Sequence, residues 1–282
     1  MKLTRRRALV AAAAAVAATG GCAALDEQQR RWIFQPSKDT WGGGHAAQGM
    51  DDVWLDFRSD GADVRLHGLW LAPDDADAPL MLYLHGARWN LASSAGRMRR
   101  MHALGFAVLG IDYRGFGQST DQLPSEDSAH EDALQAWRWL AARRPGAPRY
   151  VYGHSLGSAI AVRLATEGDE PPAGVVLEGA FTSIPELVST FKYGWLPVGP
   201  LISQRFDSAA RIGRLKSPLI AVHGARDSLV PLELGRRLFD RAPEPKRFVQ
   251  VEHGSHHNAS GAGLDELRAA VGALFKTGPT SA

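Results

Sequence analysis

The chain has 282 residues, of which 45% are hydrophobic and 22% are charged, and its formal net charge is +2. This size and composition suit one large globular domain or two small ones, with an ample core. Because Lys2, Arg5, Arg6 and Arg7 all precede Cys22 with no acidic residue among them, the rest of the chain is slightly acidic, which excludes a basic nucleic-acid-binding surface.

The N-terminus has the organisation of an export signal. A basic cluster precedes an alanine-rich apolar run over residues 8–18, which is too short to span a bilayer comfortably. Residues 4–9 resemble a twin-arginine motif, with alanine where an aromatic residue is usual. We therefore predict that residues 1–21 are a signal peptide and that the protein is exported.

Cys22 is the only cysteine, and it follows the small residues Thr19-Gly20-Gly21. This pattern is typical of a lipobox, in which the cysteine thiol takes a diacylglycerol group; the alternative is an incidental thiol inside a cleaved signal. The alanine after Cys22 resembles the outer-membrane sorting pattern of Gram-negative lipoproteins. We predict a lipid anchor at Cys22, a location on the periplasmic side of the outer membrane, a polar tether over residues 22–31 and no disulfide.

The remaining chain has the pattern of an α/β domain. Residues 53–57 and 64–71 alternate in polarity around Ser59-Asp60-Gly61 and predict an antiparallel hairpin. Apolar strands then alternate with helical periods such as 128–143 and 231–241. The predicted strands are 80–84, 106–111, 150–152, 174–177, 219–222 and 247–251. Near-continuous apolar strands with intervening helices indicate a mostly parallel sheet covered on both faces.

The pentapeptide Gly153-His154-Ser155-Leu156-Gly157 directly follows one of these strands. A Gly-x-Ser-x-Gly run between a strand and a helix is typical of a nucleophile elbow, where a sharp turn exposes the serine hydroxyl above the sheet. Side chains at the two glycine positions would collide with the strand-to-helix crossing. Ser155 is therefore the predicted nucleophile.

The connection over residues 181–215 is longer than the others and is rich in aromatic residues and prolines. It follows the carboxyl end of a strand, where catalytic loops gather in α/β proteins. We predict that it forms a small cap over the site; the alternative is an excursion that packs on the core.

A catalytic serine needs a neutral histidine to take its proton and an acid to orient that histidine. In this architecture the order along the chain is serine, acid, histidine. Asp227 follows the strand 219–222 and is the predicted acid, although alone it would pass for a turn aspartate that caps the next helix. Glu178, at the end of the strand 174–177, is the alternative carboxylate.

Three histidines follow the last strand, in Glu252-His253-Gly254-Ser255-His256-His257. The small residues Gly254 and Ser255 allow the loop to approach the sheet, which favours His256 as the base, with His257 second and His253 third. A histidine cluster also suits a metal ion, but no spaced carboxylate or cysteine ligands accompany it. We predict neither a metal nor an organic cofactor.

The oxyanion of an acyl-transfer intermediate is best held by backbone N–H groups, because fixed donors need no reorganisation as charge develops. One predicted donor is Leu156, directly after the nucleophile. The other lies in the turn His85-Gly86-Ala87-Arg88 after the strand 80–84, and we assign it to the Ala87 amide.

Together these pieces resemble the α/β-hydrolase superfamily over nearly the whole chain from about Trp32. The resemblance rests on His85-Gly86, on the stretch from Asp112 to Ser119, on the pentapeptide around Ser155 and on the stretch from His223 to Pro231. It is nearest to single-domain serine hydrolases related to prolyl-oligopeptidase catalytic domains and to depalmitoylase-like proteins. The chain departs from many relatives in lacking a Gly-rich oxyanion turn and in carrying Ala87-Arg88 where asparagine is common.

The resemblance implies an α/β-hydrolase fold over residues 32–282 and a Ser155-Asp227-His256 triad that cleaves carboxylic esters or thioesters. The expected partners are a small or lipid-like acyl substrate and the membrane that holds Cys22. The same triad also suits a serine peptidase or amidase, and a catalytically silent binding module is the alternative from another class.

Overall fold

A mixed sheet organises the chain in the computed structural model, which describes residues 21–40, 45–73 and 75–275. Within these residues the sheet has eight strands in the order β1-β2-β4-β3-β5-β6-β7-β8. The strands are β1 (Asp51–Ser59), β2 (Ala62–Leu71), β3 (Leu80–Leu84), β4 (Ala107–Ile111), β5 (Arg149–His154), β6 (Gly174–Glu178), β7 (Leu219–Gly224) and β8 (Lys246–Val251). The hairpin β1-β2 is antiparallel, β2 pairs antiparallel with β4, and all other pairs are parallel. The predicted fold class is confirmed.

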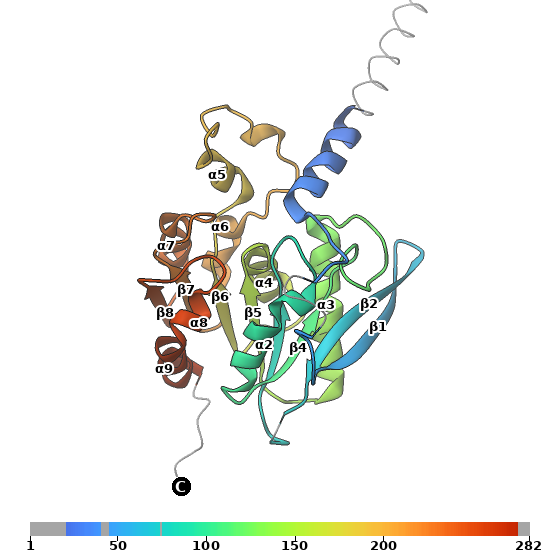
Figure 1. The fold of residues 1–282 in the computed structure, drawn as a ribbon, viewed down its shortest axis with the longest axis vertical. Helices are drawn as coiled ribbons and strands as arrows, with labels where there is room; N and C mark the ends of the chain where they lie inside the picture. The colour runs from blue at the N-terminus through green and yellow to red at the C-terminus, as the bar shows by residue number, and fades with distance from the viewer. Residues whose placement is uncertain (1–20, 41–44, 74, 276–282) are drawn as a thin grey trace, which may run out of the picture.

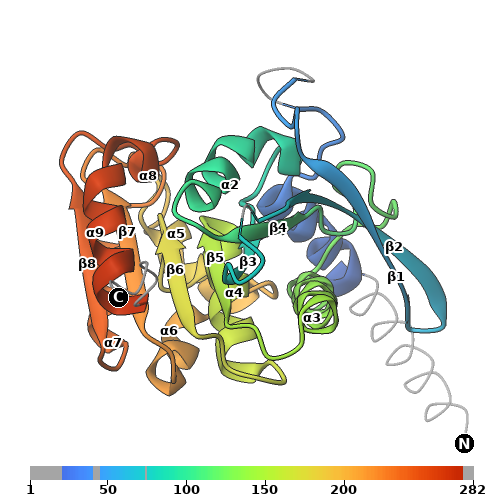
Figure 2. The same cartoon turned by 90° about the horizontal axis from the view of Figure 1, so that it is seen from below.

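Helices cover both faces of the sheet (Figure 2). Successive strand residues point to opposite faces, so Leu82 and Leu84 pack into one apolar core while Met81 and Tyr83 pack into the other. The helices α3 (Glu126–Arg143), α4 (Leu156–Glu167), α6 (Ser208–Arg211) and α7 (Leu232–Arg241) lie over the first core. The helices α2 (Ala95–His102), α8 (Ala259–Ala262) and α9 (Leu264–Phe275) lie over the second.

Residues 21–34 are helical, where the sequence predicts a polar tether over residues 22–31. Their polar side chains pair one helical turn apart, Asp26 with Arg30 and Glu27 with Arg31, which supports a helix. The segment also docks on the protein, since the Gln29 side chain donates to the Leu201 carbonyl at 2.8 Å. Of the predicted signal peptide, residues 1–20 lie outside the described residues.

Cys22 is exposed near the start of this helical segment. In the described ranges 21–40, 45–73 and 75–275, no helix has the length and apolarity needed to cross a bilayer.

The long connection after β6 holds α5 (Ile184–Ser189) and three short turns, η2 (Gly199–Leu201), α6 and η3 (Ile212–Arg214); a further short turn, η1 (Leu91–Ser94), precedes α2. Figure 1 shows α5 and the N-terminal helical segment at the same end of the molecule, beyond the sheet. This is the end at which the loops after the parallel strands converge, and it contains the candidate site.

Candidate active site

Ser155 occupies the sharp turn between β5 and α4. Its backbone has φ +54° and ψ −120°, a conformation that costs energy for any residue with a side chain. The neighbouring glycines make the turn possible, because a Cβ on Gly153 would lie 2.3 Å from the Gly157 carbonyl oxygen and one on Gly157 would lie 2.2 Å from the Leu84 oxygen. The Ser155 amide donates to the Glu178 carbonyl at 2.9 Å, which fixes the turn to the end of β6.

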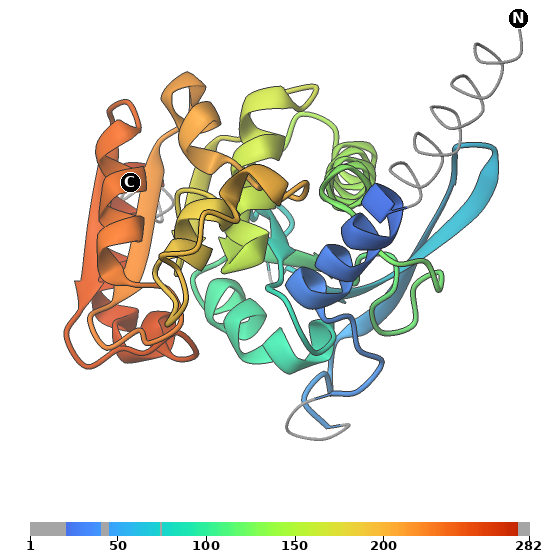
Figure 3. The same cartoon turned by 90° about the horizontal axis from the view of Figure 1, so that it is seen from above.

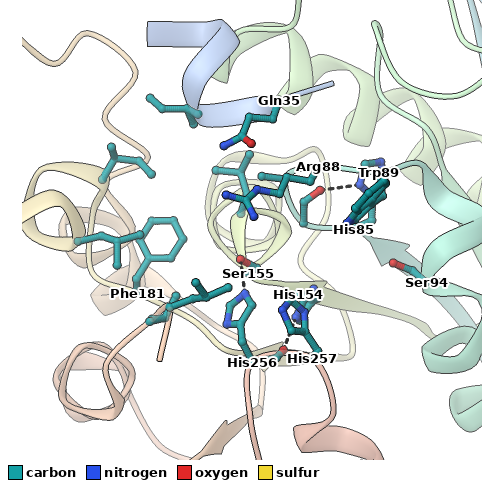
Figure 4. A pocket seen from close by; sticks show the side chains of 18 of the residues that line it. Gln35, His85, Arg88, Trp89, Ser94, His154, Ser155, Phe181, His256 and His257 are labelled. Atoms are coloured by element: carbon teal, nitrogen blue, oxygen red, sulfur yellow. Dashed lines mark hydrogen bonds between the residues drawn. The ribbon is translucent and has the colours of Figure 1, made fainter. Parts of the chain in front are cut away.

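The three residues predicted to act together form a continuous hydrogen-bonded chain. The Ser155 Oγ lies 2.9 Å from His256 Nε2 (Figure 4). On the other side of the ring, His256 Nδ1 lies 2.7 Å from Asp227 Oδ2. With Nδ1–H donating to the carboxylate, Nε2 is free to accept the serine proton. The other Asp227 oxygen accepts the amides of Leu229 at 2.9 Å and Val230 at 2.8 Å.

The environment of Asp227 favours its charged form. Burial opposes ionisation, but the hydrogen bond and charge of His256 and the two backbone amides outweigh burial and hold the pKa of Asp227 below its usual value. The loops that carry Asp227 and His256 follow β7 and β8 and touch each other, since a Cβ on Gly224 would lie 2.3 Å from the Gly254 oxygen. A carboxyl group whose surroundings favour its charged form is therefore held beside the imidazole.

The side chains of the alternative base and acid candidates, His257, His253 and Glu178, are not part of this hydrogen-bonded chain. The exposed His257 ring lies nearly perpendicular to that of His256, and its centroid is 5.4 Å away. His253 lies 2.9 Å from the guanidinium of Arg226. The Glu178 carboxylate is fully buried and bonds to Arg97. Among the candidate residues, the structure brings only His256 and Asp227 into line with Ser155.

The two predicted oxyanion donors both lie in the wall of the cavity in front of Ser155. Leu156 is the first residue of α4, so its amide lies among the N–H groups that have no partner within the helix. In the other turn the Arg88 amide is already used, because it donates to the Phe34 carbonyl at 2.9 Å. This leaves the adjacent Ala87 amide as the better candidate, a distinction that the sequence does not contain.

The cavity has a volume of about 510 Å³. The connection after β6 contributes an apolar wall, formed by Phe181, Ile184, Leu187, Val188 and Phe191. Figure 4 shows Phe181 on one flank of Ser155, with His85, Trp89 and Ser94 on the other. Trp32 and Ile33 of the N-terminal helical segment also line the cavity. An apolar pocket with a few convergent polar groups is typical of a small-molecule site.

A buried cluster next to the site was not predicted. The Arg97 Nε lies 2.6 Å from Glu178 Oε2, and its Nη2 donates to the carbonyls of His257 at 2.9 Å and His256 at 3.3 Å. The Tyr152 hydroxyl donates to the same carboxylate at 2.6 Å. Burial opposes the charge of Glu178, but Arg97 outweighs it and places the Glu178 pKa well below its usual value. The sequence signal was a carboxylate at the end of an apolar strand, which implies a buried cationic partner.

His154, between Gly153 and the nucleophile, belongs to the same cluster. Its Nε2 lies 3.0 Å from the His256 carbonyl oxygen and 3.1 Å from Arg97. Burial and the Arg97 charge place the His154 pKa well below its usual value, so this imidazole is neutral. Within the described part of the chain, no group of three or more histidine, cysteine, aspartate or glutamate residues is arranged to hold a metal ion.

The chain is similar to one described protein family and to several proteins of known sequence. Residues 76–208 match the family described as serine aminopeptidase, S33. An uncharacterized protein of Mycobacterium tuberculosis is 35% identical over 234 residues, which are 82% of this chain and 81% of that protein. The lysophosphatidylserine lipase ABHD12 of Rattus norvegicus is 33% identical over 225 residues, which are 72% of this chain and 51% of the lipase. The chain thus spans about half of that lipase.

Two solved structures share the fold. The esterase Pf2001 of Pyrococcus furiosus superposes with a TM-score of 0.68 at 19% identity, covering 86% of this chain and 99% of the esterase. The acylaminoacyl peptidase of Pyrococcus horikoshii superposes with a TM-score of 0.62 at 14% identity, covering 80% of this chain and 41% of the peptidase. At these identities the likeness concerns the fold alone.

Proposed function

The chain belongs to the α/β-hydrolase superfamily and is of its esterase and lipase type, and on that premise we propose that it cleaves carboxylic esters or thioesters of lipid-like acyl groups through an acyl-enzyme on Ser155. The observation that carries the proposal is the hydrogen-bonded chain from Ser155 through His256 to Asp227 at the wall of an apolar cavity.

Each residue has a role that its position supports. His256 takes the proton of Ser155 as Oγ attacks the acyl carbonyl, and then gives that proton to the leaving group. Asp227 keeps Nδ1 of His256 protonated and stabilises the imidazolium. The amides of Ala87 and Leu156 hold the tetrahedral oxyanion; losing one such donor costs about 2.7–4 kcal/mol of barrier stabilisation. A water molecule activated by His256 then releases the acyl group.

An ester-cleaving role is supported by the apolar cavity wall and by the similarity to the rat lysophosphatidylserine lipase. The match to the serine aminopeptidase family favours a peptidase or amidase as the second candidate. Assays of p-nitrophenyl acyl esters of increasing chain length beside aminoacyl-anilides separate the two. We expect the esters to react faster, and faster turnover of the anilides would overturn the esterase proposal.

The catalytic role of Ser155 has a direct test. A fluorophosphonate probe forms a covalent bond only with an activated serine, so we expect it to label the wild-type protein and not the Ser155→Ala variant. An unlabelled but folded wild-type protein would instead support a non-catalytic binding module.

The choice of base is tested by two neighbouring variants. His256→Ala should lose most of the activity, because its ring is the one that contacts Ser155 Oγ. His257→Ala should have a milder effect, and the reverse result would transfer the role to His257.

We also propose that residues 1–21 are removed on export and that Cys22 carries the lipid that anchors the protein on the periplasmic side of the outer membrane. The catalytic domain then covers residues 32–282, with residues 181–215 as a small cap. Cys22 is exposed, as a lipidated residue must be. A mass shift on Cys22, and processing that is blocked by globomycin, are the expected results; an unmodified thiol would contradict the anchor.

A further inference from the structure

The exposed large hydrophobic side chains of the described residues are concentrated in one region. Ten of them are exposed, and all except Trp54 belong to segments that contribute to the cavity wall. Seven of these lie on the N-terminal helical segment and on residues 191–201, and we call them the rim face: Leu25, Trp32, Phe191, Tyr193, Trp195, Leu196 and Leu201. Trp195 is 78% exposed and Tyr193 65%, which is unusual for residues of this size.

The two segments of the rim face are held together. The rings of Trp32 and Phe191 meet edge to face with centroids 6.4 Å apart. The Ser203 hydroxyl donates to Asp26 at 2.6 Å, beside the bond from Gln29 to the Leu201 carbonyl. Figures 1 and 3 show the N-terminal helical segment and the connection after β6 next to each other at the end of the molecule that contains the site. The exposed side chains therefore belong to one joined platform.

The chemistry of this platform fits a lipid bilayer better than water. Tryptophan and tyrosine combine an apolar body with a polar edge and are enriched where proteins meet the interface of a membrane. Residues 190–201 contain no acidic residue and one lysine, Lys192. On the helical segment, Asp26 and Glu27 are paired with arginines, which offsets their charge. Anionic headgroups therefore meet little repulsion.

We propose that the rim face rests on the surface of a bilayer that contains anionic lipids, with the cavity opening toward the membrane. An acyl substrate then passes from the bilayer along Trp32 and Phe191, which lie both in the rim face and in the cavity wall. This contact is separate from a lipid on Cys22, and it does not depend on the chemistry at Ser155.

The test uses residues 22–282 with Cys22→Ser, so that neither a lipid nor the basic and apolar residues 1–21 contribute, and vesicles of phosphatidylethanolamine and phosphatidylglycerol. We expect this protein to sediment with the vesicles. The added pair Tyr193→Ser and Trp195→Ser should lower the partition coefficient about tenfold, because two interfacial aromatic rings are lost. Trp54→Ser is the matched control and should leave binding unchanged, since Trp54 lies on the β1-β2 hairpin.

A second readout separates membrane contact from loss of folding. Neither Tyr193 nor Trp195 lines the cavity, so the double variant should hydrolyse a soluble short-chain ester at the parent rate. Vesicles whose lipids carry bromine should quench tryptophan fluorescence in the parent protein, and less in the double variant. Equal vesicle binding by the double variant and the Trp54→Ser control would overturn the proposal. So would absence of binding by the parent, or a stable dimer that loses its association when Trp195 is replaced.

Discussion

Arg97 and Glu178 form a buried ion pair, with 2.6 Å between Nε and Oε2, and the same guanidinium donates to the backbone carbonyls of His256 and His257. The pair thus connects α2 to the end of β6 and to the loop of the histidine. A second bond from the Ser260 amide to Glu178, at 2.9 Å, holds the far side of that loop. The position of His256 therefore depends on a charge pair that does not itself contact the Ser155 hydroxyl.

Substitutions of Arg97 and Glu178 separate the effect of this ion pair on protein stability from its effect on the position of the His256 loop. Arg97→Gln leaves the buried Glu178 unpaired, and we expect a loss of about 3–5 kcal/mol in the free energy of unfolding. The double variant Arg97→Gln with Glu178→Gln removes both charges and should recover part of that loss. It should still turn over an ester about tenfold or more slowly with little change in KM, because His256 and His257 remain without their donor.

Chemical denaturation and steady-state kinetics measure both effects. Arg99→Gln is the control, because Arg99 lies on the same helix but is exposed and bonds to the carbonyls of Ala46 and Gln48. A double variant that regains full kcat together with its stability would show that the pair serves the fold alone.

Asp227→Asn tests the orientation of the imidazole. Asparagine still accepts the amides of Leu229 and Val230 but presents an NH₂ group or a weaker acceptor to His256 Nδ1, which favours the wrong tautomer. We expect kcat to fall about 10⁴-fold with the melting temperature nearly unchanged. A fall of less than tenfold would remove Asp227 from the acid role.

Two glycine substitutions, one in the elbow and one in α9, should change the free energy of unfolding in opposite directions. A Cβ at position 153 would lie 2.3 Å from the Gly157 oxygen, a backbone atom that cannot yield, so Gly153→Ala should cost about 4 kcal/mol or more. A Cβ on Gly272, in α9, would meet no atom within 4 Å, and Gly272→Ala should stabilise the protein by about 0.5–1 kcal/mol. Thermal unfolding of both variants checks the contrast, and a stable Gly153→Ala protein would contradict the tight crossing.

The stability of the protein should fall as the pH is lowered from 7 to 5. Burial lowers the pKa of five of the described histidines below the usual value: His85, His130, His154, His223 and His257. Below about pH 6.5 the unfolded chain binds protons at these positions and the folded chain does not, so acid favours unfolding. His67 acts in the opposite direction, because Asp112 and Asp52 outweigh its burial and raise its pKa.

One histidine allows a quantitative check. Burial lowers the pKa of His130 to about 4. Between about pH 6.5 and that value the unfolded chain binds a proton at this position and the folded chain does not, so the free energy of unfolding falls as the pH is lowered. With its partial exposure taken into account, this is about 1 kcal/mol at pH 5. His130→Gln should therefore reduce the fall in melting temperature between pH 7 and pH 5 by about 2–4 °C. The exposed His45→Gln variant is the control, and an identical pH profile in all three proteins would refute the assignment.

Much of the fold follows from sequence patterns, because the buried parallel strands are continuous apolar runs such as Leu80–Leu84. The helix α3 begins two residues before the predicted start at 128, since Ser125 and Ser128 exchange side-chain bonds across its first turn. The N-terminal helical segment was missed, although its charged pairs four residues apart are a helix signal.

The candidate site, like the fold, is predictable from the sequence only in part. Motif and chain order single out Ser155, Asp227 and His256, which the structure brings within hydrogen-bond distance; their catalytic roles remain predictions. The inward position of Arg97 has no pattern of its own, because Arg97 lies among other arginines on α2 and only the fold decides which one is buried. Similarly, only the Phe34 contact distinguishes the Arg88 amide from that of Ala87.

That contact between the Phe34 carbonyl and the Arg88 amide joins two segments that are more than fifty residues apart in the sequence. Phe34 braces the turn that carries Ala87, and its neighbours Trp32, Ile33 and Gln35 line the cavity. Substitution within residues 32–35 would therefore change the support of this turn and the lining of the cavity together.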